Sequence, residues 1–309
     1  MATELDRGRL AGIWSATPTP LLEDDSIDLD SIPRLVEHHL RLGVRGLFLG
    51  GTCGEGAWLR RQDLRRFVRE TARASAGRLL LAVQITDNSA GRMLDNALEA
   101  AEDGADLAVI APPYFLLNAT DTTVRDLYLQ AVRGCPLPVG IYDRGKAGSV
   151  AVSAAVLEAI YAEPAVVLVK DSSCDASRRD LALRARAARP ALRLLTGNEF
   201  DLVSYRRAGY DGALLGGGIF NGFLAGQILA ACDRGRVDEA EALQARMNEL
   251  MWDVYGGRDI ACWLTGLKEL LVRLGVFSSN RNLLRYPLTA DCSQAIDRAC
   301  ERERAILLP

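Results

Sequence analysis

The sequence predicts an α/β protein with a (β/α)8 (TIM) barrel and a C-terminal helical extension. Short apolar segments alternate with amphipathic helical patterns along most of the 309 residues, and eight such pairs occur in succession. The apolar segments are continuous runs, the pattern of parallel strands that are buried on both faces. Eight strand–helix units with right-handed crossovers close a barrel, and the pattern after them is purely helical. We therefore assign residues 1–225 to a catalytic barrel and residues 226–309 to a helical extension packed on it.

An open doubly wound sheet is the competing architecture. Such a sheet usually carries a Gly-rich nucleotide-binding fingerprint after its first strand. Here the first strand ends in Thr17-Pro18-Thr19-Pro20, which favours the closed barrel. The predicted strands, in order, are 10–17, 44–50, 79–85, 106–111, 138–142, 166–170, 192–196 and 211–215.

Serine, glycine and proline mark the ends of the predicted helices. Gly43, for example, suits the position just after the first helix, where a left-handed residue often ends the turn. The helices are predicted from about Ser31, over 64–72 with a stop near Gly77, over 89–102, around 124–131, from Ser153, over 177–188 before Pro190, and up to Gly209. Three further helices are predicted over 237–255, over 260–274 and from about Ser293.

Composition excludes several classes of function. The apolar share is 49%, the charged share is 25% and the net charge is −3, so no basic field attracts nucleic acid. No apolar run has the length of a membrane span, and residues 1–10 lack the core of a signal peptide. The seven cysteines are odd in number and form no C-x-x-C pair, which favours free thiols in a reducing cytoplasm.

The histidines narrow the chemistry. His38 and His39 are the only two, and as neighbours in a helical pattern they do not both face one site. This argues against a multi-histidine metal centre and against a Ser-His-Asp triad. We therefore expect no metal and no other cofactor. Carbonyl chemistry without a metal points toward covalent catalysis through an imine.

Lys170 is the candidate nucleophile. It ends the apolar strand 166–170, where it is partly desolvated. Burial disfavours an ammonium ion, and a neutral amine can attack a carbonyl carbon. Only three lysines occur, Lys146, Lys170 and Lys268, and arginine cannot replace lysine in an imine. The alternative is a strand-end lysine that extends its ammonium group to solvent.

Active sites of such barrels lie at the carboxyl ends of the strands. Tyr142 and Lys170 end neighbouring strands, roughly 5 Å apart, so the tyrosine is a candidate proton shuttle or, alternatively, a rim aromatic. The loop 50–56 lacks the ending of a phosphate-binding P-loop, but it can turn several N–H groups toward a carboxylate. The alternative is a simple tight loop without a binding role. Other residues at strand ends are Thr52, Cys53, Tyr114, Glu199 and the glycines 216–218.

These segments carry a family resemblance. Gly51-Thr52-Cys53-Gly54-Glu55, Ile141-Tyr142, Val169-Lys170-Asp171-Ser172-Ser173 and Thr196-Gly197-Asn198-Glu199 resemble motifs of the dihydrodipicolinate synthase / N-acetylneuraminate lyase family. The resemblance covers nearly the whole chain. It implies a class I aldolase-type lyase in which Lys170 forms an imine with pyruvate or another 2-oxo acid.

The same resemblance implies roles for further residues. Tyr142 relays protons, and Thr52 and Cys53 hold the substrate carboxylate. The remaining substrate-binding positions would be Gly51, Tyr114, Lys146, Gly197, Glu199, Gly218 and Ile219. A homotetramer is also implied.

Three departures bear on the substrate. Phe115 stands where the lysine-pathway synthase has a second tyrosine. Tyr142-Asp143 is followed by Arg144-Gly145-Lys146 instead of that enzyme's proline and arginine setting, and Cys53 replaces a hydroxyl. We therefore expect aldol cleavage or dehydration of a 2-oxo-3-deoxy sugar acid or a similar hydroxylated 2-oxo acid. Glu199 would accept hydrogen bonds from substrate hydroxyls, or alternatively assist the following helix.

Three alternatives stay open. The first is 4-hydroxy-tetrahydrodipicolinate synthase, which condenses pyruvate with aspartate semialdehyde. The second is a non-catalytic barrel that binds a 2-oxo acid. The third is a phosphate-site barrel enzyme that uses the glycines 216–218.

Overall fold

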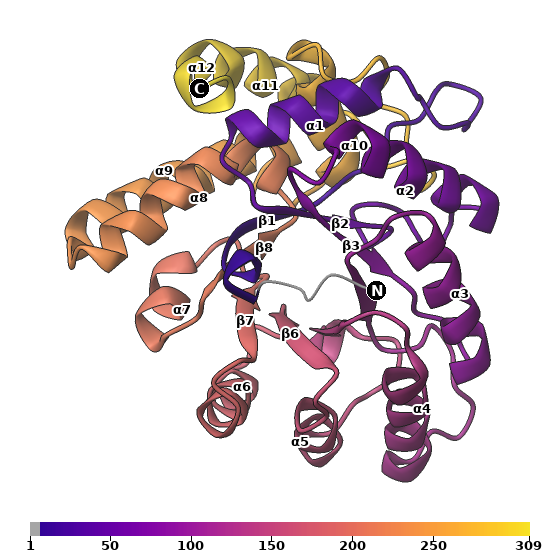
Figure 1. The fold of residues 1–309 in the computed structure, drawn as a ribbon. Coiled ribbons are helices and arrows are strands. Elements are labelled where there is room, and N and C mark those ends of the chain that lie inside the picture. Colours follow the sequence, from indigo (N-terminus) through magenta and orange to yellow (C-terminus); the bar gives the residue numbers. More distant parts are fainter. Residues whose placement is uncertain (1–6) are drawn as a thin grey trace.

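The eight apolar segments form a closed barrel of parallel strands in the computed structural model, which describes residues 7–309 (Figure 1). Each strand pairs with the next along the chain, and β8 pairs with β1. The strands are β1 (Gly12–Ala16), β2 (Gly46–Leu49), β3 (Leu80–Gln84), β4 (Leu107–Ile110), β5 (Val139–Asp143), β6 (Val166–Asp171), β7 (Arg193–Thr196) and β8 (Gly212–Leu215). The predicted fold class, a (β/α)8 barrel with a helical extension, is confirmed.

A ring of helices surrounds the strands, as Figure 1 shows. These are α1 (Ser31–Arg41), α2 (Arg61–Ser75), α3 (Ala90–Glu102), α4 (Asp121–Gly134), α5 (Ala154–Tyr161), α6 (Ala176–Ala188), α7 (Leu202–Ala208) and α8 (Gly218–Asp233). Two short 3-10 turns, η1 (Arg7–Leu10) and η2 (Gly145–Ala147), precede β1 and follow β5.

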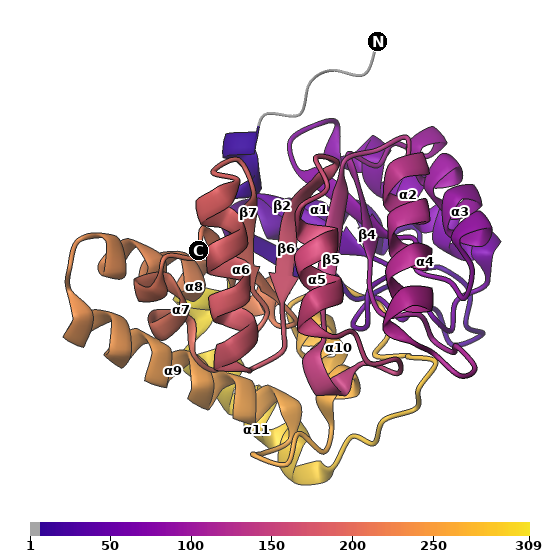
Figure 2. The ribbon, with the colours of Figure 1, turned by 90° about the horizontal axis from the view of Figure 1, so that it is seen from below.

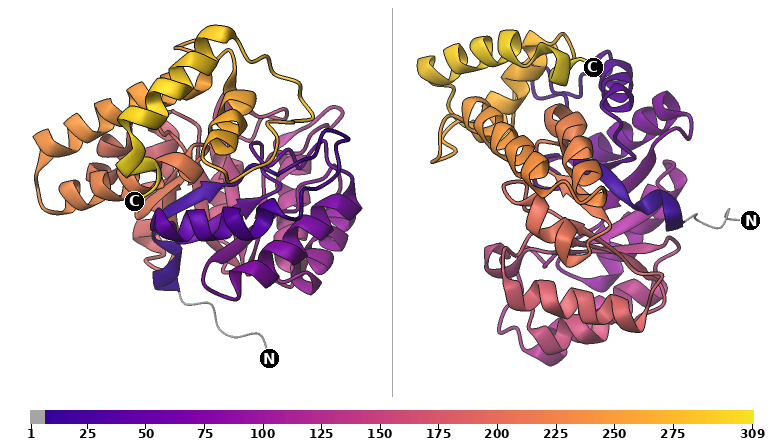
Figure 3. Two further views of the ribbon diagram at one scale, coloured as in Figure 1. Left: turned by 90° about the horizontal axis from the view of Figure 1, so that it is seen from above. Right: turned by 90° about the vertical axis from the view of Figure 1, so that its left-hand side faces the viewer.

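The extension consists of α9 (Val237–Tyr255), α10 (Trp263–Arg273), α11 (Ala290–Arg302) and α12 (Arg304–Leu307). Figure 2 shows α9, α10 and α11 along one end of the barrel, and Figure 3 shows the C-terminal helices packed together beside α1. Trp263 of α10 packs against the apolar cluster inside the barrel, so the extension lies close to the interior.

The barrel separates two apolar layers because side chains alternate between the faces of each strand. One layer fills the interior and includes Trp14, Phe48 and Leu168. The other lies between the strands and the helices and includes Ile13, Leu47 and Val169. The interior of the barrel is therefore packed with side chains.

Local signals predicted several helix ends correctly. The Ser89 and Ser153 side chains accept hydrogen bonds from Arg92 and Val156 N–H groups and cap α3 and α5. Gly43 has φ +74° and follows α1 as predicted. A left-handed residue without a Cβ ends a helix at little steric cost.

Other boundaries differ from the predictions. The first strand begins at Gly12 because residues 7–10 form η1 instead. Helix α10 begins at Trp263, since Ile260 has φ +53° and does not continue a right-handed helix. Helix α11 begins at Ala290 because the Thr289 side chain caps it, and α12 was not predicted. The division at 225/226 falls inside the continuous helix α8, so no break in secondary structure marks it, and it stays a prediction.

Candidate active site

Lys170 and Tyr142 meet inside the mouth of the barrel. They are directly paired in the register of β5 and β6. Lys170 Nζ lies 4.0 Å from the centroid of the Tyr142 ring and 5.0 Å from that of the Phe48 ring. The two residues are only 5% and 7% exposed, respectively. The sequence prediction that these two strand ends meet in a desolvated place is confirmed.

The Tyr142 hydroxyl is polarised by its surroundings. Burial raises the pKa of Tyr142, but the Lys170 charge, the Arg144 charge and a hydrogen bond with Thr52 outweigh it, and the net pKa lies below the usual 10.0. A phenol with a lowered pKa releases its proton more readily. Arg144 contributes through its guanidinium, whose central carbon lies 5.9 Å from the Tyr142 ring centroid.

Close backbone packing shapes the loop 50–56 after β2. A Cβ on Gly56 would lie 1.8 Å from the Gly50 oxygen, so only glycine fits there. A Cβ on Gly51 would lie 2.5 Å from the Phe48 ring. The loop is thus compact, and it carries Thr52 next to Tyr142.

Cys53 lies inside this mouth as a neutral thiol. Its side chain is buried against the interior cluster. Burial raises the pKa of the Cys53 thiol to about 12. A thiol in this state is a weak hydrogen-bond donor and not a nucleophile.

A cavity of about 170 Å³ opens beside Thr52 and Tyr142, and neither Lys170 nor Cys53 is among the residues that line it. It brings together the predicted residues Gly51, Thr52, Tyr114 and Tyr142. The Tyr114 hydroxyl accepts a hydrogen bond from Gln84 Nε2 at 2.9 Å. The Gln84 Oε1 atom is buried and has no hydrogen-bond partner in the structure.

Gln84 and Arg144 both line this cavity, and neither was singled out as a site residue from the sequence. Gln84 is the last residue of β3. The predicted strand continued to residue 85, so Gln84 was not recognised as a strand-end residue. Arg144 belongs to the segment Arg144-Gly145-Lys146, which departs from the setting of the lysine-pathway synthase.

Lys146 lies elsewhere than predicted. It is exposed in η2 and does not line the cavity, whereas Arg144 does. Gly145, with φ +53°, turns the chain between the two residues, and this turn separates their side chains. The cation at the mouth is therefore Arg144.

Glu199 and Gly197 lie on the opposite side of Lys170, after β7. Glu199 accepts hydrogen bonds from the Gly217 N–H at 2.7 Å and from the Tyr255 hydroxyl at 3.1 Å. Burial raises the pKa of Glu199. A Cβ on Gly197 would lie 1.8 Å from Ser172 Oγ and 3.3 Å from Lys170 Cε, so this glycine makes room first for Ser172 and then for the lysine chain.

Gly218 and Ile219 begin α8 and are packed tightly. A Cβ on Gly218 would lie 2.7 Å from Ser15 Cα, which requires glycine for close approach to β1. The Ile219 side chain is fully buried in the outer apolar layer, and its carbonyl accepts a hydrogen bond from His38 Nε2 at 2.7 Å. The Ile219 side chain is therefore part of the core and does not face the cavity.

No group of three or more His, Cys, Asp or Glu side chains suited to a metal ion occurs in residues 7–309. None of the helices in this range has the length and apolar character that a membrane span requires. All seven cysteines are free.

A buried lysine beside a tyrosine at the mouth of a (β/α)8 barrel is the arrangement of a class I aldolase-type lyase. The chain belongs to the dihydrodipicolinate synthetase family, whose family model matches residues 9–300. The members of this family are class I aldolase-type lyases that act on small-molecule 2-oxo acids, and this protein is an enzyme of that type.

Individual relatives carry two different names. The chain is 25% identical to 4-hydroxy-tetrahydrodipicolinate synthase of Gluconobacter oxydans over 300 residues, which cover 95% of this chain and 97% of the relative. It is 26% identical to N-acetylneuraminate lyase of Rhizobium meliloti over 279 residues, 89% of this chain and 85% of the relative. The structure of dihydrodipicolinate synthase from Bacteroides thetaiotaomicron superposes with a TM-score of 0.85 and 29% identity, and covers 95% of this chain and 98% of that one.

Proposed function

We propose that this enzyme forms an imine between Lys170 and a hydroxylated 2-oxo acid, and that it cleaves or dehydrates a 2-oxo-3-deoxy sugar acid or a similar substrate. The observation that carries the proposal is the direct pairing of Lys170 with Tyr142, 4.0 Å from nitrogen to ring centroid, beside the loop that holds Thr52.

The chemistry follows from these positions. The Lys170 amine, once it has given up its proton, attacks the carbonyl carbon of the 2-oxo acid and gives a carbinolamine. Tyr142, hydrogen-bonded to Thr52, protonates the departing hydroxyl, which leaves as water and yields the imine. The cationic imine then accepts the electron pair of the bond that breaks. The substrate carboxylate is assigned to Thr52 and the N–H groups of the loop 50–56, with Cys53 as a neutral neighbour.

The cavity wall supports a hydroxylated and acidic substrate. Gln84 Oε1 is a buried acceptor without a partner, and such an atom favours a ligand that donates a hydrogen bond. Arg144 supplies a positive charge on the same wall. Glu199 already accepts hydrogen bonds from Gly217 and Tyr255, so we assign hydroxyl recognition to Gln84 in preference to Glu199.

The second candidate is condensation of pyruvate with aspartate semialdehyde. It is favoured by the name of the relative from Gluconobacter oxydans. Phe115 argues against this condensation because it stands where the lysine-pathway synthase has a second tyrosine, and phenylalanine has no hydroxyl to relay a proton. A non-catalytic binding barrel needs no nucleophile, so the retention of Lys170, Tyr142 and Thr52 together argues against that alternative.

We further propose a homotetramer and a cytoplasmic location. The homotetramer is consistent with the exposed apolar side chains Phe115 and Leu117, which are 65% and 73% exposed in the single chain and would gain from a subunit contact. The location is an expectation from the odd cysteine count.

Two experiments test the proposal. Incubation with pyruvate and borohydride should add one reduced pyruvyl group to the peptide that contains Lys170, as mass spectrometry detects. An adduct on another residue, or none with any 2-oxo acid, would overturn the imine assignment.

A substrate panel then decides between the two reactions. Release of pyruvate or of a dehydrated 2-oxo product from deoxy sugar acids supports our proposal. Turnover of pyruvate with aspartate semialdehyde, together with no reaction of the sugar acids, would establish the second candidate instead.

A further inference from the structure

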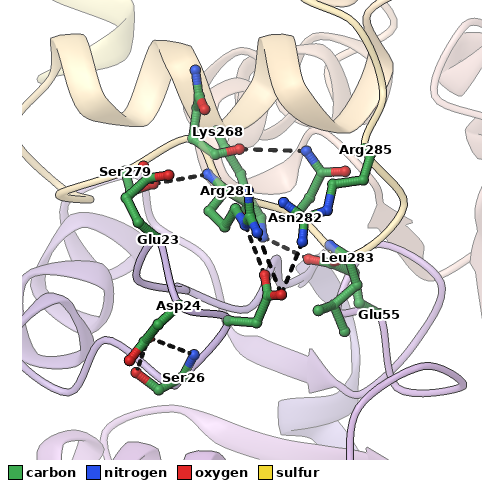
Figure 4. Close-up of polar contacts among 12 residues, drawn as sticks. Glu23, Asp24, Ser26, Glu55, Lys268, Ser279, Arg281, Asn282, Leu283 and Arg285 are labelled. Carbon is green, nitrogen blue, oxygen red and sulfur yellow. Dashed lines mark hydrogen bonds and ion pairs between the residues drawn. The ribbon is translucent and has the colours of Figure 1, made fainter.

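An ion pair at complete burial joins the C-terminal extension to the loop 50–56. Lys268 of α10 and Glu55 are both 0% exposed, and Lys268 Nζ lies 2.5 Å from Glu55 Oε1 (Figure 4). The two residues are 213 positions apart in the sequence. Moving two charges entirely out of water costs desolvation free energy, and an apolar pair of similar size often stabilises a fold equally well.

The remaining polar atoms of this pair are also bonded to the extension. Lys268 Nζ donates to the Arg281 carbonyl at 2.6 Å, and the Leu283 N–H donates to Glu55 Oε2 at 2.5 Å. Figure 4 shows how α10 and the segment 281–283 surround the Glu55 carboxylate. Both carboxylate oxygens of a loop residue are thus held by groups from beyond the barrel.

Glu55 needs such contacts because of its backbone. Its φ is +58°, a left-handed conformation that is uncommon for a residue with a Cβ and that persists only where its surroundings enforce it. The Glu55 N–H donates to the Thr52 carbonyl at 3.2 Å, which closes the turn that presents Thr52 and Cys53. The Glu55 backbone is therefore hydrogen-bonded directly to the residue that lies next to Tyr142.

The extension reaches the mouth at two other places. Trp263 packs against the interior cluster that contains Tyr142 and Cys53. The Tyr255 hydroxyl donates to Glu199 on the far side of the mouth. The Glu55–Lys268 contact is therefore one of several that the extension makes around the site.

We propose that Glu55 and Lys268 are positioning residues that fix the loop 50–56 for binding the carboxylate of the 2-oxo acid, so that the extension completes the active site. The assignment of this loop to the carboxylate rests on the function proposed above. Neither residue contacts the reacting carbonyl; both act through Thr52.

The test compares two matched substitutions. Glu55→Gln removes the charge of the loop residue, and Glu303→Gln removes a similarly buried carboxylate, 4% exposed, that pairs with Arg246 and Arg302 within the extension. Trapping of Lys170 by borohydride is measured over a range of pyruvate concentrations. Glu55→Gln should raise the half-saturating concentration about tenfold, equivalent to about 1.4 kcal/mol, and change the limiting trapping rate by less than about twofold. Glu303→Gln should lower the thermal midpoint without raising the half-saturating concentration.

The proposal is overturned if Glu55→Gln binds pyruvate like the wild type, or if both substitutions weaken binding equally, since either result assigns the ion pair to stability alone. If Glu55→Gln does not fold, Glu55→Asp replaces it. This variant keeps the charge but is one methylene too short to reach both Lys268 and Leu283. The same rise in the half-saturating pyruvate concentration is expected.

Hydrogen exchange of the ligand-free protein gives a readout that is independent of the reaction. Amides of the loop 50–56 should exchange faster in Glu55→Gln than in the wild type and in Glu303→Gln, and unchanged exchange would refute the positioning role. If the wild type forms no adduct with any 2-oxo acid, the proposed function fails, while the exchange comparison still decides whether the ion pair fixes the loop.

Discussion

Substitution of Tyr142 by phenylalanine isolates the hydroxyl that we assign to proton transfer. Phenylalanine keeps the ring against which Lys170 Nζ rests at 4.0 Å, and it removes the hydroxyl that is bonded to Thr52. A general acid–base group contributes on the order of 10² to 10⁴ in rate. We therefore expect turnover to fall by this factor, which corresponds to a barrier higher by about 2.7 to 5.5 kcal/mol.

Stability should change much less than turnover. The hydroxyl forms one hydrogen bond with Thr52, and one such bond contributes about 1 kcal/mol net. In a large domain this loss lowers the thermal midpoint by only about 2 to 4 °C. The ring remains in place beside Phe48, with the two centroids 6.0 Å apart in the parent structure, so the packing of the mouth is kept.

Steady-state turnover, borohydride trapping and the pH–rate profile together test this prediction. Because the Lys170 and Arg144 charges and the Thr52 hydrogen bond hold the pKa of Tyr142 below its usual value, an ionisation below pH 10 should be present in the wild-type profile and absent from the variant. Tyr128→Phe is the matched control, since Tyr128 is also buried, 1% exposed against 7% for Tyr142, but lies in α4, outside the cavity. Turnover close to wild type in Tyr142→Phe would refute the assignment.

Other predictions address the nucleophile, the cation at the mouth, acid stability and assembly. Lys170→Arg should abolish the borohydride adduct because a guanidinium stays protonated, and a persisting adduct would contradict this. Arg144→Ala should raise the KM of an acidic substrate about tenfold or more, while Lys146→Ala, on the exposed turn, should leave the KM unchanged. Burial lowers the pKa of His38 to about 4 and that of His39 to about 3, against 6.5 in the unfolded chain. Below pH 6.5 the unfolded chain therefore binds protons that the folded chain excludes. The contribution of the two histidines to the free energy of unfolding should be fully present above pH 6.5 and should fall toward pH 4 by about 1.4 kcal/mol per pH unit for each histidine. Equal urea midpoints at about pH 7 and about pH 5 would refute this. Light scattering should give the mass of a tetramer, and a fully active monomer at micromolar concentration would contradict the assembly.

The sequence was sufficient for the barrel and for the central pair because both depend on short-range patterns. Continuous apolar runs located the strands, and each run ended close to the strand end in the structure. Once eight parallel strands close a barrel, residues that end consecutive strands become neighbours by geometry alone. Tyr142 and Lys170 end β5 and β6, so their contact followed from the fold class.

Side-chain direction was not predictable in the same way. Gln84 reads as an ordinary strand residue, and only the observed register turns its amide toward Tyr114. Arg144 and Lys146 are equivalent as charges in the sequence, and the turn at Gly145 decides which of them lines the cavity. Such choices depend on the φ angle of a single residue, which composition and periodicity do not report.

The scarcity of lysine in this chain is informative at more than one position. Each lysine raises the question why arginine would not serve there, and at position 170 the reason is that an imine needs an amine, which arginine cannot supply. The same question applies to Lys268, whose single nitrogen fits between Glu55 and the Arg281 carbonyl at 0% exposure. A guanidinium there would bring five donors into a space with acceptors for few of them, so lysine is required for its size and not for its reactivity. The ion pair with Glu55 also keeps this amine occupied and out of reach of substrate. Lys268 is held in its ion pair and Lys146 is exposed on a turn outside the cavity, whereas Lys170 is buried beside Tyr142, which lines the cavity. We therefore expect borohydride to trap a single lysine peptide, the one that contains Lys170.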